Sequence, residues 1–240
     1  MSGAPELSVV VPVHNEQDNV APLVDEICTA LRGVVDFEIV YVDDCSRDGT
    51  LDALRQLQGS VAELRVVRHL SQSGQSTAIR NGVKAARGTW IATLDGDGQN
   101  DPADLPRLLA RRSDAPVVRM FAGWRVDRRD SGSKRWASKW ANAIRRRMLR
   151  DDTPDTGCGT KLFARDAFLE LPYFDHMHRY LPALMQRAGF RTESVPVNHR
   201  NRGAGTSKYN NLGRALVGVR DLVGVAWLIK RSRITATEEL

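Results

Sequence analysis

The sequence predicts an α/β fold in which a mostly parallel, doubly wound sheet carries helices on both faces. Short apolar, β-branched runs alternate with segments of helical spacing over residues 1–100, which is typical of a parallel sheet. The runs are apolar at nearly every position, as strands buried on both faces are. Three of them end in polar clusters, and in such sheets ligands bind beyond the carboxyl ends of the strands.

The expected elements follow in chain order. Strands are predicted at residues 7–13, 37–42, 64–68 and 89–94, and the helices between them at residues 20–31, 50–58 and 77–86. Gly33 and Gly88 end the first and third helices. After Pro102 a helix covers residues 104–112 and the alternation weakens: strands are expected at residues 116–121, 161–165 and 191–198, and helices at residues 134–150, 180–188 and 209–231. We expect one domain over residues 1–208, with an amphipathic C-terminal segment at residues 209–240.

Length and composition fit a single soluble domain with a proper core, since 240 residues suffice for one large α/β unit. The net charge of +6 and the pI of about 9.5 favour an anionic partner. Cys28, Cys45 and Cys158 have neither zinc nor disulfide spacing, which indicates a reducing compartment. We expect no secretory signal, and no apolar run reaches the roughly 18 residues that a spanning helix needs.

A carboxylate cluster follows the predicted strand at residues 89–94. Asp95 and Asp97 are interleaved with Gly96 and Gly98, which permit a sharp turn and the close approach of a bulky anion. Mg²⁺ binds through one or two carboxylates plus substrate phosphates, so this pair is a candidate for holding a metal against a diphosphate. A surface turn is the alternative, because Asp-Gly pairs are common in turns. An EF-hand is excluded, since Asn100 and Pro106 stand where that loop needs Gly and Glu.

Two further polar clusters follow the first and second strands, at residues 14–16 and 43–44. Three clusters at one edge of a sheet favour a ligand site over three unrelated turns. A dinucleotide-binding fold is the competing interpretation, but no Gly-x-Gly-x-x-Gly follows the first strand.

Five motifs in order resemble one known family. They are Val-Val-Pro-Val-His-Asn-Glu, Val-Asp-Asp-Cys-Ser-Arg-Asp-Gly-Thr, Leu-Asp-Gly-Asp-Gly-Gln-Asn-Asp-Pro, Asp-Thr-Gly-Cys-Gly-Thr-Lys and Arg-Gly-Ala-Gly-Thr-Ser-Lys-Tyr, over residues 7–209. They are similar to the motifs of inverting family 2 glycosyltransferases with the GT-A nucleotide-sugar-binding fold. Within that family the chain resembles most the dolichyl-phosphate mannose synthases and the bacterial polyprenyl-phosphate hexose synthases. It departs from them at Cys158, where many have Ser, at Lys161, where many have Arg, and at His14, where Tyr is common.

The resemblance implies a site for a nucleotide sugar, a GDP- or UDP-sugar. The donor-binding residues would be Pro12, Val13, Asn15, Glu16, Asp43, Asp95, Arg202 and Lys208. Mg²⁺ or Mn²⁺ would be held by Asp95, Asp97 and Gln99, where it neutralises charge on the leaving diphosphate. Asp43 would contact the base or the ribose, whereas Asp44 either does the same or caps the following turn. We interpret His14 as a polar pocket wall rather than a base.

The resemblance also places an acceptor phosphate on a basic stretch that begins at Arg125. The implied phosphate-binding residues are Arg125, Lys134, Arg135 and Ser138, and the implied catalytic set is Asp95, Asp97, Arg125 and Arg135. A lipid phosphate is already largely ionised near neutral pH, so no strong base is needed. A solvated basic face is the alternative, but Arg can bind phosphate bidentately, which favours the site.

Two segments predict contact with a membrane surface. In residues 134–150, an apolar stripe recurs every four residues and is surrounded by basic residues; the stripe is Trp136, Trp140, Ile144 and Met148, and the basic residues include Lys139, Arg145, Arg146, Arg147 and Arg150. Residues 212–229 form the second segment, and basic residues follow it. Core packing is the alternative for the stripe. We expect a protein that is peripheral on the cytoplasmic, inner face of the membrane, with a separate membrane subunit as a candidate partner.

The predicted activity is transfer of a hexose from a nucleotide sugar to a polyprenyl phosphate, dolichyl or undecaprenyl. The first alternative is a family 2 transferase acting on a glycan or lipid hydroxyl, for which Asp155 is the candidate general base. The second is a non-catalytic membrane- or nucleic-acid-binding module of the same fold. Asp95 and Asp97 argue against it, and no nucleic-acid-binding motif is recognisable, so we expect no nucleic-acid partner.

Overall fold

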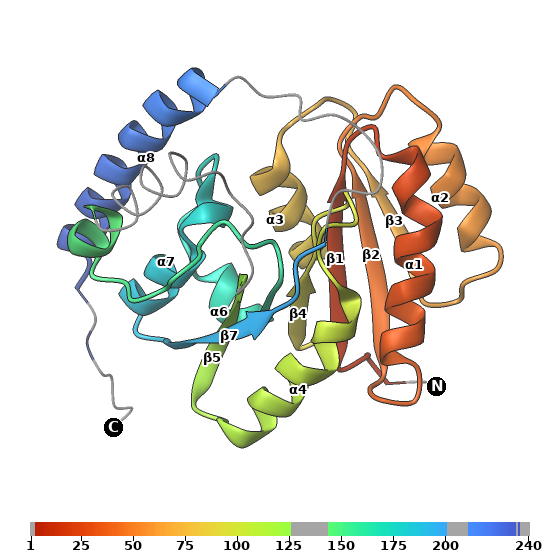
Figure 1. Ribbon diagram of the computed structural model, residues 1–240, viewed down its shortest axis with the longest axis horizontal. Helices are drawn as coiled ribbons and strands as arrows, with labels where there is room; N and C mark the ends of the chain where they lie inside the picture. The colour runs from red at the N-terminus through yellow and green to blue at the C-terminus, as the bar shows by residue number, and fades with distance from the viewer. Residues whose placement is uncertain (1–2, 126–143, 201–210, 234, 236–240) are drawn as a thin grey trace, which may run out of the picture.

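The protein is described by a computed structural model that covers residues 3–125, 144–200, 211–233 and 235. Its centre is a seven-stranded sheet of order β3-β2-β1-β4-β6-β5-β7 (Figure 1). Six strands run parallel and only β6 runs against its neighbours β4 and β5. The predicted mostly parallel sheet with helices on both faces is confirmed.

The first half of the chain alternates strictly. Its elements are β1 (Leu7–Val13), α1 (Gln17–Leu31), β2 (Phe37–Asp43), α2 (Thr50–Gln58), β3 (Leu64–Arg68), α3 (Gln75–Ala85) and β4 (Trp90–Thr93). The register places Val13 of β1 opposite Asp43 of β2, and Val10 opposite Thr93 of β4. The carboxyl ends of β1, β2 and β4 therefore lie side by side.

The second half is less regular. It comprises the short 3₁₀ helix η1 (Pro102–Asp104), α4 (Leu105–Asp114), β5 (Val118–Arg125), β6 (Lys161–Ala164), α6 (Arg165–Leu169), η2 (Met177–Arg179), α7 (Leu181–Arg187), β7 (Arg191–Val197) and α8 (Asn211–Arg231). Residues 144–149 are helical, and they are the described part of the helix predicted at residues 134–150. The strand at residues 161–164 enters the sheet antiparallel between β4 and β5, and the short helices α6 and η2 were not predicted.

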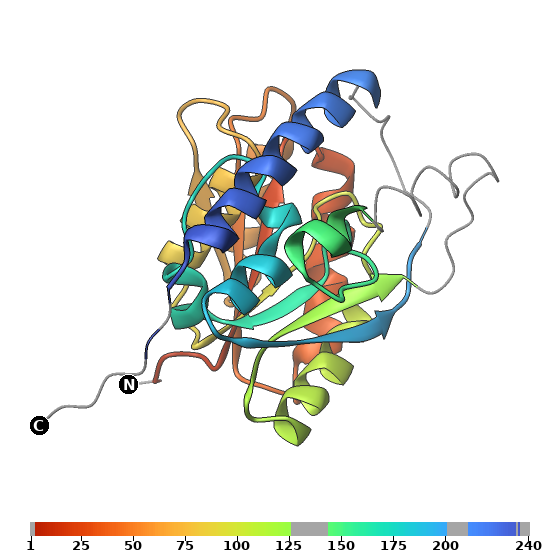
Figure 2. The ribbon, with the colours of Figure 1, turned by 90° about the vertical axis from the view of Figure 1, so that its left-hand side faces the viewer.

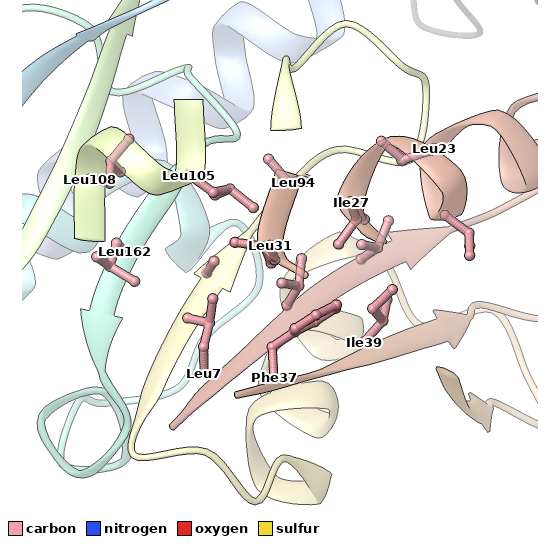
Figure 3. Packing of buried hydrophobic residues seen from close by; sticks show 14 of the residues in the cluster. Leu7, Leu23, Ile27, Leu31, Phe37, Ile39, Leu94, Leu105, Leu108 and Leu162 are labelled. Carbon is pink, nitrogen blue, oxygen red and sulfur yellow. The ribbon is translucent and has the colours of Figure 1, made fainter. Parts of the chain in front are cut away.

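Alternate residues of the strands feed two separate cores. On one face, β1 and β2 pack against α1, α2 and α4 through side chains such as Leu7, Ile27 and Leu105 (Figure 3). On the other face, Val10 and Val40 pack against α3, α6 and α7. Each large aliphatic side chain buried in this way contributes roughly 1.5–3 kcal/mol. The two cores hold the sheet rigid, so that loops at its carboxyl edge are fixed in place.

The opposite, amino-terminal edge of the sheet contains a closed polar network around Glu38, at the start of β2. Its carboxylate accepts hydrogen bonds from Ser8 Oγ at 2.7 Å, from an Arg65 Nη at 2.7 Å and from the Arg87 backbone N–H at 2.6 Å. Burial alone would raise the pKa of Glu38, but these donors outweigh burial and lower the pKa. This edge is a structural junction in which both carboxylate oxygens of Glu38 have partners.

Candidate functional site

The polar clusters predicted at the ends of β1, β2 and β4 lie together at the carboxyl edge of the sheet. Pro12 and Val13 are buried at the end of β1. A Cβ added at Gly96 would collide with the Val13 side chain, so the turn after β4 can pack against β1 only with glycine there. The glycine thus brings the carboxylate-bearing loop directly against the predicted donor-binding strand.

The loop after β1 is fixed by hydrogen bonds to the loop after β2. His14 Nδ1 donates to the Asp44 carbonyl oxygen at 2.9 Å. Asn15 has a left-handed φ of 56° and accepts from the Arg47 backbone N–H at 2.7 Å. The Glu16 backbone N–H donates to Thr50 Oγ1 at 2.9 Å. These contacts fix the loop after β1 against the loop after β2, and the role of His14 as a pocket wall stays a prediction.

Asp43, the last residue of β2, is completely buried. Its Oδ1 accepts from the Ser46 backbone N–H at 3.2 Å, but its Oδ2 has no hydrogen-bond partner within the described part of the chain. A buried acceptor without a partner costs about 1–3 kcal/mol. Such an atom fits a site that receives an N–H or O–H donor from a ligand, which is the role predicted for Asp43.

Asp44, directly beside it, is fully engaged within the protein. Its Oδ1 accepts from His69 Nδ1 at 2.7 Å and from the Ser73 backbone N–H at 2.8 Å, and its Oδ2 accepts from the Gly74 backbone N–H at 2.8 Å. Of the two interpretations left open, the structural one agrees with these contacts. The turn that Asp44 fixes is, however, the one between β3 and α3 and not the turn directly after β2.

The candidate metal ligands lie on the loop after β4. Asp95 Oδ1 accepts from Gln75 Nε2 at 2.8 Å, and the Asp95 backbone N–H donates to Asn100 Oδ1 at 2.7 Å. Asp97 Oδ1 accepts from the Gln99 backbone N–H at 3.1 Å. Burial and then the charge of Asp97 raise the pKa of Asp95, whereas Lys161 acts in the opposite direction. Two carboxylates that repel one another in a partly buried loop are a favourable place for a cation.

A divalent cation fits this donor set. Within the described residues, no three His, Cys, Asp or Glu side chains converge as a closed metal site. Mg²⁺ does not require such a site, because it is commonly held by one or two carboxylates and completed by substrate phosphates and water. Asp95 and Asp97 lie together on one loop with Gln99 two residues further on, and their binding of a cation stays a prediction.

Residues 155–161, which lead into β6, close the other side of the loop. A Cβ at Gly159 would collide with Asp95 Oδ2, so only glycine permits this packing. The Lys161 side chain is buried and donates to the Cys158 carbonyl oxygen. Burial lowers the pKa of Lys161 although Cys158 and Asp95 favour its charged form. Sequence analysis did not assign a role to Lys161, even though a single lysine at the start of an apolar strand was a usable signal.

The acceptor side of the prediction is only partly described. Arg125, at the end of β5, forms a bidentate ion pair with Asp155, with Nε–Oδ2 of 2.6 Å and Nη2–Oδ1 of 3.0 Å. Burial opposes the charge of Arg125, but Asp155 raises its pKa overall. Lys134, Arg135 and Ser138 lie outside the described residues, as do Trp136 and Trp140. The pair shows that Asp155, the candidate base for a hydroxyl acceptor, is already engaged by a guanidinium.

Residues 199–200, which precede the motif that contains Arg202 and Lys208, are hydrogen-bonded to the loop after β4. The Arg200 backbone N–H donates to the Gln99 carbonyl oxygen at 3.0 Å, and His199 forms an isolated β-bridge with Asn100. The Arg200 guanidinium bonds to Glu26 at 2.9 Å and to Asp101 at 2.5 Å. Arg202 and Lys208 lie outside the described residues, but the chain enters their segment directly beside Gln99.

Two exposed surfaces bear on the membrane prediction. Ile144 and Met148 are exposed on the helical residues 144–149, whereas Arg145, which the sequence suggested would surround the stripe, is buried and paired with Asp151 at 3.2 Å. The outer helix α8 lies over α7 (Figure 2), and exposes Val219, Val223 and Trp227 at 57–62%. None of the helices described is both long enough and apolar enough to cross a bilayer.

Comparison with known sequences places these features in context. Residues 8–171 match the family model "Glycosyl transferase family 2". The chain is 33% identical over 230 residues to a dodecaprenyl-phosphate galacturonate synthase of Rhizobium johnstonii, which covers 94% of this chain and 68% of the relative. It is 32% identical over 205 residues to an undecaprenyl-phosphate 4-deoxy-4-formamido-L-arabinose transferase of Edwardsiella ictaluri, covering 85% of this chain and 62% of that protein.

Solved structures show the same fold at low sequence identity. A mannosyltransferase of Pyrobaculum calidifontis in complex with GDP-Man and Mn²⁺ has a TM-score of 0.71 and 20% identity, and the match covers 98% of this chain and 67% of that one. A glucosyl-3-phosphoglycerate synthase of Mycobacterium tuberculosis with Mg²⁺ and UDP has a TM-score of 0.69 and 18% identity, over 97% and 81% of the two chains. These similarities confirm the expected GT-A fold.

Proposed function

We propose that this chain, which belongs to glycosyltransferase family 2, transfers a sugar with inversion from a nucleotide sugar to a polyprenyl phosphate. The observation that carries the choice of acceptor is the Arg125–Asp155 ion pair. Removing a proton from a hydroxyl would require a base with a free acceptor oxygen. The pair instead presents a guanidinium, which suits a phosphate that is already ionised. The names of the similar lipid-phosphate sugar transferases support the same acceptor class.

The donor would lie across the carboxyl edge of the sheet. The unpartnered Oδ2 of Asp43 would accept a hydrogen bond from the base or the ribose. Pro12, Val13, Asn15 and Glu16 would line the nucleotide pocket. Asp95, Asp97 and Gln99 would hold Mg²⁺ or Mn²⁺, which supplies positive charge to the leaving nucleoside diphosphate. Arg202 and Lys208 are proposed to bind the same diphosphate, because their segment begins beside Gln99.

The acceptor phosphate would be bound by Arg125 together with Lys134, Arg135 and Ser138. The ion pair with Asp155 uses two of the five guanidinium donors of Arg125, so other donors are left for phosphate oxygens. Asp155 fixes the plane of the guanidinium, which would hold a bound phosphate in one orientation. Asp95, Asp97, Arg125 and Arg135 form the proposed catalytic set.

The chain is proposed to act at the cytoplasmic face of the membrane as a peripheral protein. The apolar tail of the proposed lipid acceptor must stay in the bilayer while its phosphate reaches the site. Residues 209–240 are proposed as an interfacial segment, because α8 exposes Trp227 next to Arg231, whose guanidinium lies 5.9 Å from the ring centroid. A separate membrane subunit is a further proposed partner.

A product assay tests the proposal. The purified chain would be incubated with a panel of UDP- and GDP-sugars, Mn²⁺ and undecaprenyl phosphate, and the lipid fraction analysed by mass spectrometry. We expect one nucleotide sugar to give a polyprenyl-phosphate sugar and free nucleoside diphosphate. A lipid alcohol or glycan offered as the acceptor should give no product. Transfer to a hydroxyl acceptor, with none to the lipid phosphate, would show that the acceptor has been assigned wrongly.

A further inference from the structure

One side chain that neither the motifs nor the comparisons assign reaches the candidate metal site. Gln75 is the first residue of α3, and its Nε2 donates to Asp95 Oδ1 at 2.8 Å. The Gln75 side chain is exposed, so it adds little to the core. Its hydrogen bond instead restrains the carboxylate of Asp95, a candidate metal ligand that must keep one orientation to bind a cation.

The backbone around Gln75 is held in place from below. Gly74 adopts a left-handed φ of 85°, which favours glycine, and its N–H donates to Asp44 Oδ2 at 2.8 Å. The preceding Ser73 N–H donates to Asp44 Oδ1 at the same distance. Asp44 is itself buried and also accepts from His69. A residue at the end of β2 thus sets where α3 begins, and thereby where Gln75 points.

The Asp95 carboxylate is restrained on both sides. Gln75 holds Oδ1, and Gly159 packs so closely against Oδ2 that no side chain fits between them. The Asp95 backbone N–H is fixed in addition by Asn100 Oδ1 at 2.7 Å. With both oxygens restrained, rotation of the carboxylate is limited before any cation arrives.

We propose that Gln75 is a positioning residue that fixes the Asp95 carboxylate for a divalent cation, and that Asp44 acts through the 73–74 turn to place it. The inference rests on the proposed function, since it assumes that Asp95 and Asp97 bind a metal. Groups that hydrogen-bond to a ligating carboxylate typically change metal affinity 10- to 100-fold when removed. Gln75 is uncharged, so it orients Asp95 without competing as a cation.

Metal affinity measured by calorimetry tests the inference. Mn²⁺ would be titrated into the full chain in the presence of saturating UDP, and separately of GDP, for the wild type and for Gln75→Ala. We expect Gln75→Ala to weaken Mn²⁺ binding about 10-fold with little change in thermal stability. The control is Gln72→Ala in the same turn, because the exposed Gln72 side chain makes no hydrogen bond to any described residue, and it should bind as the wild type does. Unchanged or tighter Mn²⁺ binding by Gln75→Ala would overturn the inference.

Gln75→Glu gives a second, direct readout. The substitution conserves volume but removes the donor and places a negative charge against Asp95. We expect its Tm to be below that of the wild type without metal and to rise more than the wild-type Tm when Mn²⁺ is added. An equal response of both proteins to Mn²⁺ would contradict a contact with the metal site. If the wild type binds Mn²⁺ but transfers no sugar, the proposed function fails while the role of Gln75 remains measurable.

Discussion

Strand β2 carries one buried carboxylate near each end, and the two differ in how many hydrogen-bond donors surround them. Glu38, at its start, receives hydrogen bonds from Ser8, Arg65 and the Arg87 backbone, and its pKa is lowered. Asp43, at its end, is just as buried but has one oxygen without a described partner. The residues are five positions apart on the same strand. Burial therefore does not distinguish them; the supply of donors does.

The comparison extends to the two edges of the sheet. At the amino-terminal edge, satisfied polar groups contribute to stability. At the carboxyl edge, Asp43 and the mutually repelling Asp95 and Asp97 reduce stability in the free chain, and a ligand would relieve that cost. Such local costs are typical of functional sites. Substitutions at the first edge should affect folding, and substitutions at the second edge should affect ligand binding.

The largest effect is expected from Asp97→Ala, which should lower sugar transfer by about 1000-fold, because the leaving diphosphate loses several kcal/mol of metal stabilisation. The unfolding free energy should change little, since Asp97 lies on a loop. Turnover and urea unfolding would be measured together, with the exposed Asp25→Ala as the control. EDTA in excess should reproduce the loss; full activity in EDTA would refute the metal site.

Glu38→Ala should show the reverse pattern, with the unfolding free energy lowered by about 3 kcal/mol because Arg65 and two other donors lose a buried partner. Nucleotide affinity should be retained. Because the folded pKa of Glu38 is lowered, its contribution is present above its unfolded pKa and is lost as the pH falls through the folded value. Urea unfolding at several pH values would check both points. The control is Glu170→Ala, at an exposed position. If it lowers the unfolding free energy as much as Glu38→Ala does, the hydrogen bonds of Glu38 are not the cause of the loss.

His178, which contacts α3, should make the stability of the protein depend on pH. It exchanges a hydrogen bond with Ser76 Oγ at 2.7 Å, and burial, followed by the charges of Lys161 and Arg179, holds its pKa well below the ordinary value. The unfolded chain therefore binds a proton that the folded chain does not. Stability should fall by up to about 1.4 kcal/mol per pH unit as the pH drops below about 6.5. Urea unfolding of His178→Gln should show a shallower fall; an identical pH slope would exclude His178 as the cause.

The smallest effect is expected at the outer surface of α8. Trp227→Glu should weaken binding to anionic liposomes several-fold, and each nearby basic residue adds about 1 kcal/mol that salt reduces. Flotation at low and high salt would measure both components. Val117→Glu is a control, because Val117 is equally exposed but lies between α4 and β5. Equal binding by the wild type and Trp227→Glu would show that this face does not meet the bilayer.

The first half of the fold was predictable because its strands are short, continuous apolar runs, three of which are followed by polar clusters. Apolar runs of the right length located β1 to β4, and the polar residues at their ends identified Asp43 and Asp95. The second half depends on contacts that no local pattern encodes. The antiparallel insertion of β6, the Arg125–Asp155 pair and the Arg200–Glu26 contact join residues 30 to 174 positions apart. Gln75 gave no signal, since a glutamine at a helix start is usually only solvated.

Gly159 has a consequence for how this site can vary among related sequences. Because any side chain there would occupy the space of the Asp95 carboxylate, the position should accept no substitution in a selection for transferase activity. Its neighbour Cys158 is buried in the core and accepts a hydrogen bond from Lys161 through its backbone carbonyl oxygen, so a small replacement such as serine or alanine should be tolerated there. A saturation library of residues 157–161 should therefore show one forbidden position beside a permissive one. The strictest steric limit on substitution in this segment would then be imposed by a residue that has no side chain.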